Sequence, residues 1–170
     1  MPKPSSLLTA ALVVAALAAP TQRAGAQIIP RPHVSIMGGV SQWDLSGTGT
    51  APFGAVRVDV PLVFIIAEGS LGVFRPKEDI GTSTYIIPEV QIQYQFVPFL
   101  VKPYVGIGGG WFTAVSGPGD HRSEVTGSAS AGVRVAVPVI AAGLRGEVRV
   151  RGIGSGFSGG AAEWTLGLSW

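Results

Sequence analysis

Apolar and polar residues alternate along most of this chain. The last eight residues, EWTLGLSW, show the pattern most clearly, because Trp164, Leu166, Leu168 and Trp170 occupy every second position with small or polar residues between them. A period of two predicts a β-strand with one apolar and one polar face. Chain ends usually fray into water. A strand that ends on a large aromatic residue therefore indicates an apolar face that is covered by something other than water.

Similar alternation divides the chain into eight segments. These are residues 33–43, 53–60, 62–74, 85–96, 101–114, 125–136, 140–152 and 161–170. Three Val-Pro steps, at Pro61, Pro98 and Pro138, separate consecutive segments, and they predict tight turns because proline cannot donate to a strand ladder. The other four connections are long, polar and rich in glycine: 44–52, 75–84, 116–124 and 154–160.

The fold class follows from these lengths and from the composition. The 25 glycines and 13 prolines are scattered, and no stretch after residue 27 has the apolar spacing of a helix. Eight strands of about ten residues, with short turns at one end and long loops at the other, are the layout of a transmembrane β-barrel. We therefore expect an all-β protein, an eight-stranded antiparallel up-and-down barrel with both termini at the short-turn end.

The charged residues test this expectation, because in the well-patterned segments they keep to one face. In 85–96, for example, Val90 and Ile92 alternate with Glu89 and Gln91. An arginine facing lipid at mid-bilayer costs about 2–4 kcal/mol, so the charges must point inward and thereby fix the strand register. The predicted lumen residues are Arg57, Asp59, Glu68, Glu89, Lys102, Arg134, Arg145, Glu147, Arg149, Arg151 and Glu163.

An eight-stranded barrel is only wide enough for side chains to fill it. Buried charges must be paired, so we expect a lumen packed with ion pairs and no open pore; a narrow ion path or a gated pore is the alternative. Trp43, Phe64 and Ile66 break the pattern by falling on the inward face, which predicts a bulge or a rim position at each site.

Aromatic residues gather toward the strand ends and predict two interfacial girdles. Those near the long loops are Trp43, Phe53, Phe74, Tyr85, Trp111 and Phe112; those near the short turns are Phe96, Phe99 and Trp170.

Residues 1–26 have the features of a cleavable signal peptide: a basic start, an apolar middle and the small residues AGA before a cleavage site between Ala26 and Gln27. The mature barrel domain would then span 27–170. An uncleaved anchor is the alternative, although its apolar run is short of the about 20 residues that a spanning helix needs. Of the 12 basic residues, Lys3 and Arg23 lie in the signal, which leaves 10 against 10 acidic ones. The net charge of the mature chain therefore gives no reason to expect nucleic acid or an anionic membrane surface as a partner.

The terminal strand, together with the signal and the eight segments, resembles the small bacterial outer-membrane barrels of the OmpA transmembrane domain and OmpX type. The resemblance implies an outer-membrane location, contact with outer-membrane lipid, and recognition by the outer-membrane assembly machinery through Trp164, Leu166, Leu168 and Trp170. From the parity, the four long loops and the terminal Trp170 we expect a structural or surface-interaction role with the loops as the contact surface. We also expect a monomer without cofactors. We expect no counterpart of the periplasmic domain of OmpA.

Two other functions are open. The sequence DHRSE contains His121 and Ser123 and resembles the lipid A deacylase of the PagL type, in which Ser, His and a carboxylate act together. Glu147 is a candidate for that carboxylate, but Glu124 stands where the family usually has Asn, and the segment also fits an ordinary solvated loop. A soluble lipocalin-like barrel is the third possibility, and it requires an apolar interior and a polar exterior.

Two further motifs give little support to other chemistry. The histidines His33 and His121 are far apart in the sequence, so we expect no metal site. The stretch GIGGGW (106–111) has no helix after it, so it does not fit a phosphate loop. We expect its glycines to relieve crowding, kink a strand or let a neighbouring backbone approach.

Overall fold

The computed structural model describes residues 32–42, 49–62, 65–78, 81–96, 100–117, 123–137, 142–157 and 159–170. Its strands are β1 (His33–Gln42), β2 (Thr50–Pro61), β3 (Ile65–Phe74), β4 (Lys77–Glu78), β5 (Gly81–Thr82), β6 (Thr84–Gln95), β7 (Val101–Ser116), β8 (Ser123–Val137), β9 (Ala142–Ile153) and β10 (Gly159–Ser169). None of the described residues forms a helix that is long and apolar enough to cross a membrane.

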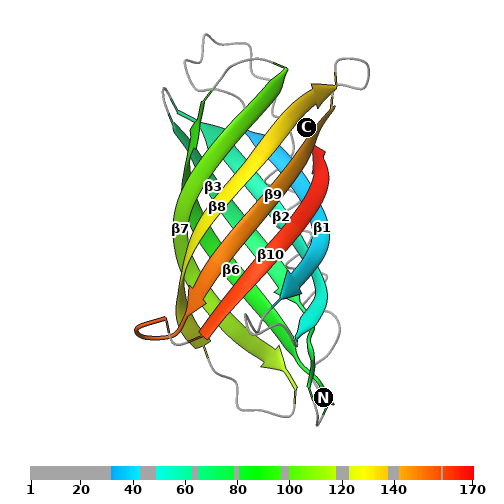
Figure 1. Cartoon of the computed structure of the whole chain (residues 1–170), viewed down its shortest axis with the longest axis vertical. Helices are drawn as coiled ribbons and strands as arrows, with labels where there is room; N and C mark the ends of the chain where they lie inside the picture. The colour runs from blue at the N-terminus through cyan, green and yellow to red at the C-terminus, as the bar shows by residue number, and fades with distance from the viewer. Residues whose placement is uncertain are drawn as a thin grey trace.

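Eight of these strands close into one antiparallel barrel (Figure 1). Their order around the wall is β1-β10-β9-β8-β7-β6-β3-β2, and β2 returns to β1. The predicted eight-stranded up-and-down barrel is confirmed, with strand ends that differ from the predicted ones by a few residues. The structure adds a two-stranded ribbon, β4–β5, inside the predicted loop 75–84, and a register shift between Thr84 and Tyr85.

The barrel closes where the first strand meets the last. β1 and β10 pair from Ser35↔Ser169 to Gln42↔Ala162. The backbone of Trp170 continues this seam, since Val34 and Trp170 exchange two hydrogen bonds of 2.9 and 3.0 Å. The N-terminal end of β1 and the C-terminal end of β10 therefore both lie at the short-turn end of the barrel, as an even number of strands requires.

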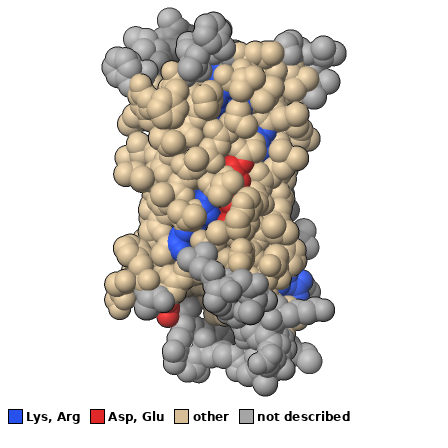
Figure 2. Space-filling model, viewed as in Figure 1, with Lys and Arg blue, Asp and Glu red and all other residues tan. Residues whose placement is uncertain are grey.

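The two faces of the wall have opposite character. Large apolar side chains are exposed on the outside, such as Ile107 (70%), Val90 (66%) and Leu166 (65%), whereas Arg145 is 0% exposed on the inside. Figure 2 shows one side of the barrel as almost wholly uncharged, with charged residues visible mainly as a narrow diagonal band. A lipocalin-like barrel needs the reverse distribution, so that alternative is wrong.

The predicted aromatic girdle at the long-loop end is partly wrong. Phe53 and Phe74 are buried, 6% and 2% exposed, in a cluster that includes Met37 and Ile87 and is packed against Tyr85 and Phe112. Phe53 has the same parity as Arg57, so its ring must point inward. The prediction used position along the strand and ignored this parity. The lumen therefore holds an apolar plug as well as charges.

Exposed aromatic residues nevertheless occur toward both ends of the barrel. Trp111 and Phe157 are exposed toward the long loops, and the Phe157 ring lies over Gly127 and Gly152. Tyr94, Phe96 and Trp170 are exposed toward the short turns. Ile66 lies at the short-turn rim, where the sequence allowed a rim position, while Trp43, Phe64 and Phe99 lie outside the described residues.

The glycines of GIGGGW make room inside the barrel, as expected. A Cβ atom at Gly106 would lie 2.7 Å from Oε1 of Gln91, and one at Gly108 would lie 2.9 Å from Oε1 of Glu89. The inner face of β7 therefore carries no side chain at the level where long side chains from β6 enter the lumen.

Candidate functional site: the charged lumen

The predicted lumen residues all lie in described strands. Nine of them are buried: Arg57, Asp59, Glu68, Glu89, Arg145, Glu147, Arg149, Arg151 and Glu163. Arg134 and Lys102 are partly buried on β8 and β7, near the short-turn end. Because strand residues of one parity share a face, β9 alone contributes four charged side chains, at every second position from Arg145 to Arg151.

Arg145 joins three carboxylates from three strands. Its Nη1 lies 3.2 Å from Oδ2 of Asp59, and its Nη2 lies 2.7 Å from Oε2 of Glu147 and also contacts Glu68. In the order around the wall, β9 and β3 are four strands apart in either direction. The pair Arg145–Glu68 therefore reaches from one side of the lumen to the other.

Arg149, which lies beyond Arg145 and Glu147 on the same face of β9, also reaches across the lumen. Its Nη2 lies 2.7 Å from Oε1 of Glu68, its Nη1 lies 3.0 Å from Oε1 of Glu89, and its Nε lies 2.9 Å from Oε1 of Glu147. Two arginines on one strand thus share Glu68 across the lumen. This arrangement fills the cross-section with side chains.

Arg151 extends this series of ion pairs toward the long loops. Its Nε donates to Oε1 of Glu163 at 3.0 Å and its Nη2 donates to Oε2 at 3.2 Å, so the guanidinium binds this carboxylate through two parallel contacts. It also contacts Glu89, which links the wall at β10 to the wall at β6.

Glu147 is the most heavily shared carboxylate. Besides Arg145 and Arg149, its Oε1 lies 2.6 Å from Nη1 of Arg57, and its Oε2 accepts a hydrogen bond of 2.5 Å from the hydroxyl of Tyr104. The guanidinium of Arg134 also lies over the Tyr104 ring, 4.2 Å from its centroid. Removal of this one carboxylate would leave several donors without a partner.

Neutral side chains of the inward face complete the network. Nε2 of Gln93 donates to Glu68 and to Oε1 of Gln91, both at 2.8 Å, and the hydroxyl of Ser130 donates to the same Gln91 oxygen at 2.9 Å. Ser128 donates to Glu89. The parity of the sequence puts all four on the inward face with Glu89 and Arg134, but the predicted lumen network included only charged residues.

The carboxylates of the network are paired throughout. Each buried carboxylate contacts at least one arginine. Among the described residues, no group of three or more His, Cys, Asp or Glu side chains could hold a metal ion.

The proposed serine site is only partly described. Ser123 is exposed at the start of β8, and its hydroxyl lies 2.8 Å from the hydroxyl of Thr113; His121 lies outside the described residues. Glu147 pairs with Gly132, nine residues along β8, which corresponds to roughly 30 Å of strand. Glu147 is also held by three arginines, Arg57, Arg145 and Arg149, so the described residues do not bring it together with Ser123.

Fold and lumen together define the class of protein: a closed eight-stranded barrel with a charged, packed interior and an apolar exterior. No model of a known protein family matches the sequence, and no curated protein matches it. Solved structures match the fold. Neisserial surface protein A (NspA) is 14% identical with a TM-score of 0.65, over 81% of this chain and 94% of that one.

Two further structures share this barrel. The outer membrane enzyme PagL is 14% identical with a TM-score of 0.58, over 81% of this chain and 97% of PagL. The N-terminal β-barrel domain of Pseudomonas aeruginosa OprF is 14% identical with a TM-score of 0.50, over 81% of this chain and 95% of that domain. At this identity the likeness concerns the fold, which an enzyme and other barrels share.

Proposed function

We propose that this protein is a small barrel of the bacterial outer membrane with a structural or surface-interaction role and no open pore. The observation that carries the proposal is the distribution of charge: an apolar, exposed outer wall surrounds a lumen that arginines cross from side to side. Outer-membrane lipid would cover the wall. The fold shared with NspA, PagL and OprF supports this location.

The long loops are the proposed surface of interaction. Loops tolerate sequence change and commonly carry binding residues on a rigid scaffold. The protein would act as a monomer without a cofactor, and the outer-membrane assembly machinery would recognise its last strand through Trp164, Leu166, Leu168 and Trp170.

Cell fractionation and electrophoresis test this proposal. The full chain, expressed in a Gram-negative host, should sediment with outer membranes and should change its gel mobility when boiled, as closed membrane barrels do. In planar bilayers the purified protein should give no sustained conductance. Recovery in the soluble periplasm would refute the location, and stable conductance steps would refute the closed lumen.

The deacylase alternative has its own test. Cells that express the chain should keep the acylation pattern of lipid A seen in cells without it. Loss of an acyl chain that depends on Ser123, and disappears in Ser123→Ala, would instead establish an esterase.

A further inference from the structure

Three cations lie side by side on the inner wall near the short turns. Lys102 on β7 pairs with Arg134 on β8, and Arg134 pairs in turn with Arg145 on β9. Like charges directly opposite one another on neighbouring strands are destabilising. The row therefore needs negative charge close to it.

The protein supplies that negative charge unevenly. Arg145 contacts three carboxylates, whereas Arg134 contacts one, Asp59, through Nη2 at 3.0 Å. Nη1 of Arg134 has no hydrogen-bond partner among the described residues. Lys102 forms no ion pair with any residue that the structure describes. Within this row, Lys102 is therefore the cation without an ion-pair partner among the described residues, and it lies at the short-turn end of β7.

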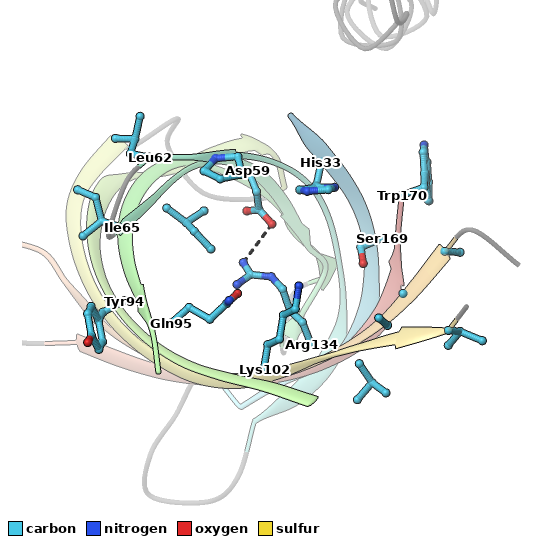
Figure 3. A pocket seen from close by; sticks show the side chains of 17 residues that line it. His33, Asp59, Leu62, Ile65, Tyr94, Gln95, Lys102, Arg134, Ser169 and Trp170 are labelled. Carbon is cyan, nitrogen blue, oxygen red and sulfur yellow. Dashed lines mark hydrogen bonds and ion pairs between the residues drawn. The ribbon is translucent and has the colours of Figure 1, made fainter. Parts of the chain in front are cut away.

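This mouth contains a cavity of about 710 Å³. Figure 3 shows that Asp59, Lys102 and Arg134 point into the ring of strands, whereas Ile65, Tyr94 and Trp170 lie on its outer side. All six residues line the same cavity. The cavity therefore connects a cationic interior with the apolar outer wall across the strand ends.

We propose that this cavity binds the headgroup of an anionic phospholipid from the adjacent leaflet, with its phosphate near Lys102 and Arg134 and its acyl chains against the apolar residues outside. A free phosphate would use the cations but leave the apolar lining unused. A neutral lipid would use the lining but leave Lys102 without a counter-charge. An anionic amphiphile satisfies both. This inference rests on the proposed membrane location.

Native mass spectrometry of the folded, detergent-solubilised chain tests the inference. The protein would be offered equal amounts of phosphatidylglycerol and phosphatidylcholine. We expect phosphatidylglycerol to be enriched by roughly fivefold, since one basic side chain near a membrane surface contributes about 1 kcal/mol. Lys102→Gln should lose most of this enrichment.

Arg75→Gln is the matched control, because it removes the same charge from an exposed residue just after β3, at the opposite end of the barrel. It should keep the wild-type enrichment. Equal loss in both variants, or equal binding of both lipids to the wild type, would overturn the inference. Inorganic phosphate that abolishes the preference at millimolar concentration would assign the cations to a free anion instead and would also overturn it.

The boiling-dependent gel shift, measured on the same samples, separates the two proposals. A folded barrel without lipid preference would refute the lipid site alone. A protein that gives no folded band in detergent would count against the barrel itself.

Discussion

At the scale of single residues, the lumen is held by shared carboxylates rather than by isolated pairs. Glu68 forms ion pairs with Arg145 and Arg149, which reach it from the opposite wall, and Glu147 forms ion pairs with three arginines. A buried ion pair is weak grounds for claiming stability, because desolvation offsets much of its attraction. Removing one partner is a different matter, since it leaves a buried charge uncompensated.

Glu147→Gln should therefore destabilise the folded barrel by about 3–5 kcal/mol, because Arg57 loses its ion-pair partner and Arg145 and Arg149 each lose one of several. Urea unfolding in lipid vesicles, followed by tryptophan fluorescence, measures the change. Glu124→Gln is the control, because that carboxylate is exposed on β8, and it should change stability by less than about 0.5 kcal/mol. Equal effects of the two substitutions would show that the shared network does not stabilise the fold.

At the scale of elements, closure of the barrel depends on how closely β1 approaches β10. A Cβ atom at Gly39 would lie 1.9 Å from the carbonyl oxygen of Trp164, and one at Gly167 would lie 2.0 Å from that of Ile36. Both contacts are with backbone, so a side chain there cannot be accommodated by a rotamer change. Both strands of the seam therefore need glycine where they approach each other, β1 at Gly39 and β10 at Gly167.

Gly39→Ala should weaken the seam, with a loss of about 1–3 kcal/mol and a smaller folded fraction in the gel-shift assay. Its neighbour Gly38 faces outward, and a Cβ atom there would meet nothing within 4 Å. Gly38→Ala should consequently leave the folded fraction unchanged. If the two alanine variants behave alike, the close approach of β1 and β10 is not what limits closure.

The last strand has a second expected role, in assembly. Trp170→Ser keeps the backbone hydrogen bonds with Val34 but removes the exposed aromatic ring. If this ring is part of an assembly signal, the variant should accumulate less in outer membranes of cells yet refold normally in detergent, and Trp170→Phe should restore accumulation. Normal accumulation of Trp170→Ser would refute the signal, and loss of refolding would assign Trp170 to stability.

At the scale of the whole molecule, the inside-out distribution of charge was predictable because a period of two assigns every residue of a strand to a face. One parity placed Arg57, Glu89 and Arg149 inside and Val90 and Leu166 outside without any structure. Phe53 was misassigned only where that parity was ignored.

The partners within the lumen could not be predicted in this way. Parity gives the face of a residue but neither the order of neighbours across the lumen nor the height at which side chains meet. The contact of Arg149 with Glu68, from strands that face each other across the barrel, depends on the register of every strand between them. The cationic row at Lys102, Arg134 and Arg145 depends on the same register.

β10 carries Leu166 and Leu168 on the outer wall and Thr165 and Ser169 on the inner wall, so in a lipid-embedded barrel only the first pair faces acyl chains. The chain has no native cysteine, so single cysteines at these four positions can carry spin labels. In vesicles, accessibility to oxygen, which concentrates in lipid, should be high at 166 and 168 and low at 165 and 169. Accessibility without this alternation, or with water-soluble reagents favoured at 166 and 168, would contradict a lipid-embedded barrel.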